Sequence, residues 1–134
     1  MKNKKKFIIS VIAVVILIGV GILLLYLKSV QNYRDKVVAI NITDIDLSSI
    51  PEGTYIGEYD VDFIYAKVEV TIKDNTITDI NLLEHKNGEG KPAERIIDDV
   101  INAQSLNVDT VSGATNSSKV IKKAIENALT QGNE

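Results

Sequence analysis

Residues 63–83 read FIYAKVEVTIKDNTITDINLL, and this stretch decides the fold of the C-terminal part of the chain. Apolar residues occupy every second position in its first half: Ile64, Ala66, Val68, Val70 and Ile72. Such alternation is typical of a β-strand that buries one face. Asp74 and Asn75 tolerate positive φ angles and mark a two-residue turn, after which residues 76–83 carry the apolar Ile77 and Ile80. The stretch therefore predicts a β-hairpin.

The segments on either side of this hairpin complete a small domain. Residues 53–59 form a short β-like segment before it, and residues 85–91 form a polar loop after it. Pro92 suits a first helical position, and apolar residues follow at helical spacing: Ala93, Ile96, Ile97, Val100 and Ile101. A last helix is expected from near Ser117 to near Gly132, and its outer, solvated face is expected to carry Lys119, Lys122 and Lys123. The expected fold class is α+β: an antiparallel β-meander followed by two packed helices.

The N-terminal part of the chain has a different character. Residues 7–27 form an uncharged run of 21 residues, which as a helix would be about 31 Å long, close to the roughly 30 Å of bilayer hydrocarbon. Four lysines precede the run, which predicts a single transmembrane helix with its N-terminus in the cytoplasm. The alternative is a cleaved signal peptide, whose apolar region is usually shorter and ends in small residues. Either way, the body of the protein is expected outside the cytoplasm.

These features divide the chain into four parts. Residues 1–6 are the basic cytoplasmic tail, residues 7–27 the transmembrane helix, residues 28–50 an extracytoplasmic stalk, and residues 51–134 the folded domain. The stalk is expected to open with a helical continuation as far as Lys36.

Composition excludes several functions. The chain has 134 residues and no cysteine, so it holds no disulfide, no thiolate metal site and no cysteine nucleophile. With His85 as its one histidine, a histidine-rich metal site is not expected. All 18 acidic residues but only 11 of the 15 basic ones lie after residue 27, and so acidic a body is not expected to bind nucleic acid.

One segment carries chemistry: Asp109-x-x-Ser112-Gly113-Ala114-Thr115-x-Ser117-Ser118. One interpretation is a helix cap, in which Asn116, Ser117 and Ser118 bond the first N–H groups of the last helix. A second is an anion site, since Gly113 lets a ligand approach the backbone and a helix start favours phosphate. A Walker A loop is excluded, because no Gly-Lys-Ser/Thr follows.

The same segment resembles the flavinylation motif of the FMN-binding domain family. That family includes the flavin-carrying subunits of the sodium-pumping quinone reductase and of the Rnf complexes. The quinone-reductase subunits are much longer than this chain. The resemblance implies that FMN is joined through its phosphate to the hydroxyl of Thr115. It also implies that a dedicated flavin transferase attaches the FMN from FAD with the help of a divalent metal.

The resemblance extends over about residues 51–130. Residues 53–57 resemble the family's opening strand and residues 68–83 its hairpin, while residues 85–90 and 104–105 resemble segments near the flavin in short members. His85 would then hydrogen-bond the flavin edge; the alternative is a solvated loop histidine. The implied cofactor site comprises Thr115 as the covalent attachment point together with Ser112, Gly113, Ala114, Asp109, Asn116, Ser117, His85, Lys86 and Gln104.

The expected function is a membrane-anchored extracytoplasmic flavoprotein that carries electrons through covalent FMN. No catalytic residue is expected, because the sequence offers no general acid–base pair and no nicotinamide-binding Gly-x-Gly-x-x-Gly. The expected partners are the flavin transferase and membrane or extracytoplasmic redox proteins. Two alternatives stay open: a small flavin-dependent reductase, and a non-redox envelope interaction domain in which the motif only caps a helix.

Overall fold

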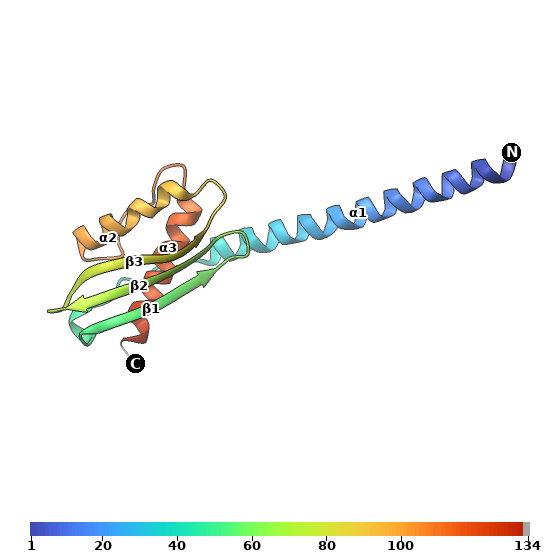
Figure 1. Cartoon of the computed structure of the whole chain (residues 1–134). Coiled ribbons are helices and arrows are strands. Elements are labelled where there is room, and N and C mark those ends of the chain that lie inside the picture. Colours follow the sequence, from blue (N-terminus) through green and yellow to red (C-terminus); the bar gives the residue numbers. More distant parts are fainter. Residues whose placement is uncertain (133–134) are drawn as a thin grey trace. The chain divides into compact units, whose positions relative to one another are not determined.

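The computed structural model of the protein describes residues 1–132 (Figure 1). The chain divides into two compact units, one of residues 1–35 and a second that begins at Lys36. The first unit consists of most of α1 (Lys2–Ala39), whose last four residues belong to the second unit.

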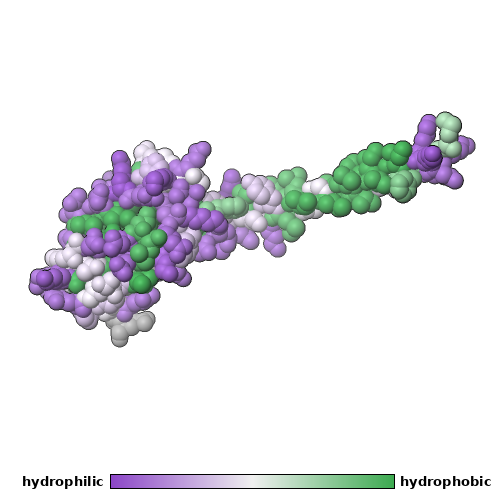
Figure 2. Space-filling view, viewed as in Figure 1, coloured by the Kyte–Doolittle hydropathy of each residue, from purple (hydrophilic) through white to green (hydrophobic). Residues whose placement is uncertain are grey.

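Helix α1 is long and apolar enough to cross a membrane. Every side chain from residue 7 to residue 27 is exposed, and Figure 2 shows this apolar surface following the hydrophilic N-terminal end. A charge-free surface of this length is stable in hydrocarbon but not in water. A secretory signal sequence has the same composition. The helix is therefore compatible with both roles expected for this segment, a transmembrane helix and a signal peptide.

The second unit contains a three-stranded antiparallel sheet in the order β1-β2-β3. Its strands are β1 (Gly53–Asp60), β2 (Tyr65–Lys73) and β3 (Thr76–Lys86). Asp74 and Asn75 connect β2 to β3 with φ angles of 51° and 58°, as a type I′ turn requires. The predicted hairpin is confirmed, as is the α+β fold class. Strand β3 is longer than expected, however, and its last two residues are His85 and Lys86, which were expected in a loop.

The helices follow the sheet. A 3₁₀ turn, η2 (Lys91–Arg95), has Pro92 in its first turn and leads into α2 (Ile96–Ala103). The last helix, α3 (Thr115–Gln131), ends where the sequence predicts but begins two residues earlier than expected. This difference matters, because it makes Thr115 a helical residue and not a loop residue.

The core lies between the sheet and α3, which crosses one face of the sheet (Figure 1). The alternating set of β2 is buried, and so is the apolar stripe of α3: Val120, Ile121, Ala124, Ile125, Ala128 and Leu129. Burying each large aliphatic side chain contributes about 1.5–3 kcal/mol. Gly57 of β1 allows the close approach, since an added Cβ would overlap the backbone of Ala124 and lie 2.8 Å from the Ala128 Cβ.

Part of the segment expected as a stalk packs on the domain. Val37 is buried, and the Lys36 ammonium lies 3.0 Å from the Asp62 carboxylate. The Asp44 carboxylate accepts hydrogen bonds from the Ser105 hydroxyl at 2.5 Å and the Leu106 N–H at 3.0 Å. Residues 36–50 therefore belong to the same compact unit as the sheet.

Candidate functional site

A tight turn precedes α3. The Ala114 N–H donates to the Val111 carbonyl at 2.9 Å, which closes the turn around Ser112 and Gly113. Gly113 has a φ of +79°, the value that the third residue of a type II turn needs. An added Cβ at Gly113 would meet no atom of the chain within 4 Å, so the glycine is required for its backbone conformation. Both turn residues are exposed.

Ser118 ties this turn to the helix. Its side chain is fully buried, accepts from the Val111 N–H at 2.9 Å and donates to the Ala114 carbonyl at 2.8 Å. The residue at the N-cap is Ala114, which supplies no side-chain hydrogen bond. The prediction that Asn116, Ser117 and Ser118 cap the helix is therefore wrong, because these residues lie within its first turn.

Thr115 is the first residue of α3, and its side chain is exposed. The first N–H groups of an α-helix have no partner within the helix, and they carry the positive end of its dipole. A surface hydroxyl thus stands beside a group of donors that favours phosphate. Asn116 is exposed next to it.

Ser117 lies on the opposite, buried side of this first turn and is 2% exposed. It packs against Gly90, where an added Cβ would lie 2.7 Å from the Ser117 Cβ and 3.3 Å from the Asn87 Cβ. The segment that follows β3 is therefore brought against the start of α3. Two regions that the sequence placed in one site, around His85 and around Thr115, meet here.

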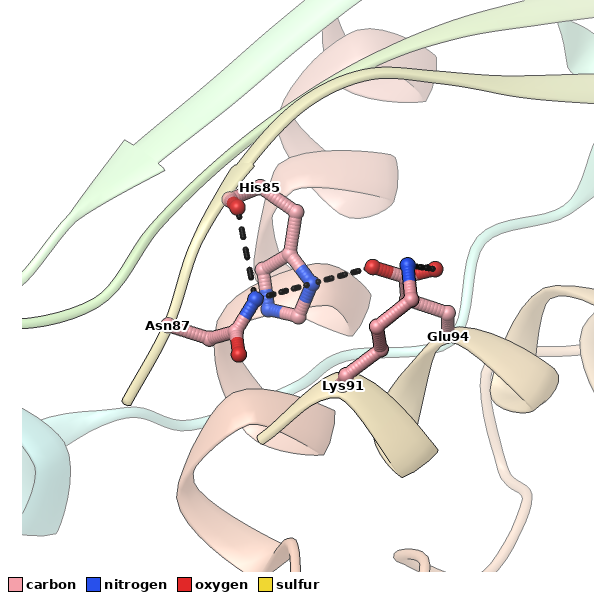
Figure 3. A network of polar contacts seen from close by, with 4 residues as sticks. All are labelled: His85, Asn87, Lys91 and Glu94. Atoms are coloured by element: carbon pink, nitrogen blue, oxygen red, sulfur yellow. Dashed lines mark hydrogen bonds and ion pairs between the residues drawn. The ribbon is translucent and has the colours of Figure 1, made fainter. Parts of the chain in front are cut away.

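His85 is enclosed, and its side chain is only 3% exposed (Figure 3). Its Nδ1 lies 3.0 Å from Oε1 of Glu94, whose Oε2 lies 3.1 Å from the Lys91 ammonium. The hydrogen bond with His85 is the main reason why the pKa of Glu94 is lowered, so Glu94 is a carboxylate at neutral pH. Among residues 1–132, nothing hydrogen-bonds the buried Nε2 of His85. The alternative of a solvated loop histidine is wrong, because β3 carries the ring inward.

Glu94 was missed by the sequence analysis. It stands nine residues after His85, in the first turn of η2, and no spacing rule links a strand residue to such a position. The one available signal was an acidic residue two positions after Pro92, since carboxylates favour the first turn of a helix.

The structure separates two other expected site residues from this cluster. Lys86 follows His85 in the strand and points to the other face of the sheet, where it donates to the Asp62 carbonyl at 2.8 Å. Gln104 ends α2 in a left-handed conformation, and its amide bonds both backbone groups of Ile77, at 2.7 and 2.8 Å. Ile77 lies near the start of β3 and His85 near its end, so Gln104 and His85 lie at opposite ends of the strand.

Asp109 is exposed and lies near Lys122. Lys122 is 8% exposed and donates to the Val108 carbonyl at 2.7 Å. Burial lowers the pKa of Lys122, and the charge of Asp109 opposes that shift. The prediction of a solvated lysine face is therefore wrong for Lys122. Lys123 is also engaged, with the Asn41 carbonyl and the Glu126 carboxylate, each at 3.0 Å.

The geometry fits a phosphorylated ligand that also has a polar ring. The exposed start of α3 suits a phosphate, and the unpartnered Nε2 of His85 suits a ring N–H. Within residues 1–132, no group of three or more His, Asp or Glu residues that could hold a metal ion comes together.

Comparison with known proteins supports such a ligand. Residues 65–130 match the sequence model of a family described as the FMN-binding domain. The matched segment runs from the start of β2 almost to the end of α3 and includes both His85 and Thr115. The search of curated proteins gave no match. Residues 65–130 of the chain therefore belong to the FMN-binding domain family.

Proposed function

We propose that the protein is a membrane-anchored flavoprotein that carries electrons through FMN attached covalently to Thr115. The observation that carries the proposal is the exposed hydroxyl of Thr115 at the first residue of α3, within a domain of the FMN-binding family. Two of the hydroxyls nearby, those of Ser117 and Ser118, are less suitable acceptors because they are buried.

Attachment would proceed from FAD on a flavin transferase with a divalent metal. A bond forms between Oγ1 of Thr115 and the FMN phosphorus while the phosphoanhydride bond of FAD breaks. AMP leaves, and the hydroxyl proton passes to solvent. Because Ser112 and Gly113 are exposed at the tip of the turn before Thr115, the acceptor is accessible to a second protein.

The residues around Thr115 would hold the phosphate, and the enclosed cluster would serve the ring. The N–H groups at the start of α3, at the positive end of the helix dipole, would offer partial positive charge to the phosphate oxygens. His85 offers the one buried side-chain nitrogen or oxygen that lacks a hydrogen-bond partner among the described residues. Bound FMN would supply one- and two-electron transfer, which protein side chains cannot provide.

The location is part of the same proposal. The four lysines before residue 7 favour an N-terminus in the cytoplasm, and helix α1 would keep the protein in the membrane. The domain would then lie outside the cytoplasm. There a covalent bond retains a cofactor that would otherwise be lost, and redox partners in the membrane or outside it would exchange electrons with it.

Expression of the full chain with and without a flavin transferase tests the proposal. The intact mass should rise by one FMN less one water only in the presence of the transferase. Thr115→Ala should abolish the increase, whereas Ser112→Ala, which removes an exposed hydroxyl of the adjacent turn, should preserve it. A wild-type protein that stays colourless beside an active transferase would favour the non-redox interaction domain, and a flavin peptide in Thr115→Ala would move the attachment site.

A further inference from the structure

The imidazole of His85 has two nitrogens in different situations. Nδ1 faces the carboxylate of Glu94 at 3.0 Å, and a carboxylate can only accept a hydrogen bond. Nδ1 must therefore carry a proton. In the neutral ring this leaves Nε2 with a lone pair, and that lone pair is buried with no partner among residues 1–132.

Such an atom requires an explanation. Buried polar groups in folded proteins are nearly always hydrogen-bonded, and an exception points to strain, a functional role, a water or an ion. A trapped water is a poor candidate, because less than 1 Å² of this nitrogen is accessible and a water needs space and several polar partners. The remaining explanation is that a group of a bound ligand becomes the hydrogen-bond partner of Nε2.

Asn87 lies where it can cover the ring. In Figure 3 its amide lies over the imidazole, on the side away from Glu94. Its Nδ2 is 3.3 Å from Nδ1 and 3.3 Å from the His85 carbonyl oxygen. Since Nδ1 already donates to Glu94, it cannot accept from Asn87, so one long hydrogen bond to the carbonyl holds the amide in place. At the next residue, Gly88, an added Cβ would meet no other atom within 4 Å, so nothing packs against that side of the segment.

We propose that Nε2 of His85 is reserved as the acceptor for a ring N–H of the flavin, with Glu94 as the positioning residue that fixes the ring's tautomer and Asn87 as its removable cover. This inference rests on the proposed function. When the flavin ring arrives, the Asn87 amide moves away from the imidazole and the ring N–H reaches Nε2. Glu94 keeps the proton on Nδ1 throughout, so the lone pair stays directed at the ligand.

The chain has a single histidine, so its imidazole can be observed without assignment. Nitrogen NMR of the full flavin-free chain in detergent, in mildly alkaline buffer, should show the proton on Nδ1. Glu94→Gln, whose amide oxygen still accepts, should keep that tautomer, and Glu94→Ala should lose it. Glu89→Ala, which removes an exposed carboxylate from the same segment, is the matched control. A wild-type ring with its proton on Nε2 would overturn the positioning role, whether or not flavin ever attaches.

The cover is tested by chemical modification. Diethyl pyrocarbonate acylates unprotonated imidazole nitrogens that it can reach, and the product is located by peptide mass. His85 should react slowly in the wild-type flavin-free chain and about fivefold to tenfold faster in Asn87→Ala, since one weak hydrogen bond holds the cover. Equal rates in the two proteins would exclude Asn87 as the cover.

Flavin loading separates this inference from the proposed function. The intact mass reports attachment independently of the histidine. In a chain whose mass shows attached FMN, His85 should become protected even in Asn87→Ala, and its Nε2 resonance should shift. Attached FMN with an unprotected His85 and an unchanged resonance would refute the contact while the proposed function stands. Absence of FMN beside an active transferase would refute the proposed function, and with it the contact.

Discussion

Gly90 and Ser117 are in direct contact, and a Cβ on Gly90 would lie 2.7 Å from the Ser117 Cβ and overlap the Ser117 hydroxyl. The contact joins the segment after β3 to the first turn of α3. It thereby brings the segment that follows His85 against the helix turn that begins with Thr115.

Gly90→Ala should destabilise the domain by about 1–3 kcal/mol, because the added methyl group forces either the segment or the helix to shift. Urea unfolding of the full chain in detergent measures the loss. Gly88→Ala is the matched control, since no atom lies within 4 Å of its new Cβ, and should change stability by less than about 0.5 kcal/mol. Ser117→Ala should recover part of the loss in Gly90→Ala. Equal stability of the two glycine variants would show that the contact relaxes freely.

Substitution of Gly113 should destabilise the domain for a different reason. A side chain there has enough space, but the φ of +79° disfavours any residue other than glycine. Gly113→Ala should cost about 1–2 kcal/mol, the usual penalty for an L residue in a left-handed conformation. Gly113→Asn should cost less, since asparagine tolerates that region. If instead flavin loading falls with the size of the side chain and stability does not change, the turn needs glycine for access.

Ser118→Ala should cost about 1–3 kcal/mol, because it leaves the buried Val111 N–H without its acceptor. Ser112→Ala, at an exposed hydroxyl in the same turn, should change stability by less than about 0.5 kcal/mol. Thermal unfolding of both variants gives the comparison. A neutral Ser118→Ala would mean that the turn finds another acceptor.

Asp44 should make stability depend on acid pH. Partial burial raises its pKa, but the hydrogen bonds from Ser105, Leu106 and Ile45 outweigh burial, so the pKa is lowered from 3.8. A carboxyl with a lowered pKa contributes stability above its unfolded value and loses that contribution as pH falls through the folded pKa. The side chain is exposed, so the contribution is at most about 1 kcal/mol after solvent screening.

Urea titrations from neutral pH to about pH 3 should therefore show the wild type losing its advantage over Asp44→Ala below the ordinary carboxyl pKa. A difference between the two proteins that stays constant with pH would mean that the hydrogen bonds do not depend on the charge.

The orientation of α1 is testable because the chain has no cysteine of its own. A membrane-impermeant maleimide added to intact cells without a wall should label Asn107→Cys, in the exposed part of the domain, and leave Asn3→Cys unlabelled until lysis. Labelling only of Asn3→Cys would reverse the topology.

The hairpin was predictable because alternation and the Asp74-Asn75 turn act locally. The sequence could not predict that the side chain of His85 points toward the core. Ile80 and Leu82 face the core side of β3, so a strict period of two would place Glu84 inside and His85 outside. A register shift between Lys67 and Val68 leaves Leu83 without a partner and returns His85 to the side of Ala66. Such a bulge depends on two strands together and leaves no local signature.

The start of α3 was misplaced for a related reason. The serines after Thr115 are good capping residues by type, yet the turn before the helix is closed by its own backbone and by Ser118 from inside the helix. The burial of Lys122 was equally hidden, because its partner is the Val108 carbonyl in a separate loop. Tertiary contacts decided both cases.

Thr115 begins a helix that is buried along one side, and this gives the proposed cofactor a fixed point of attachment. A flavin attached to a mobile loop would sample a large volume. One attached to the first residue of α3 can move only as far as its own ribityl chain allows. Under those conditions the flavin ring would meet its protein contacts at an effective concentration in the millimolar range or above. Even a weak docking site for the ring would then be occupied most of the time, so electron transfer would start from a nearly constant position.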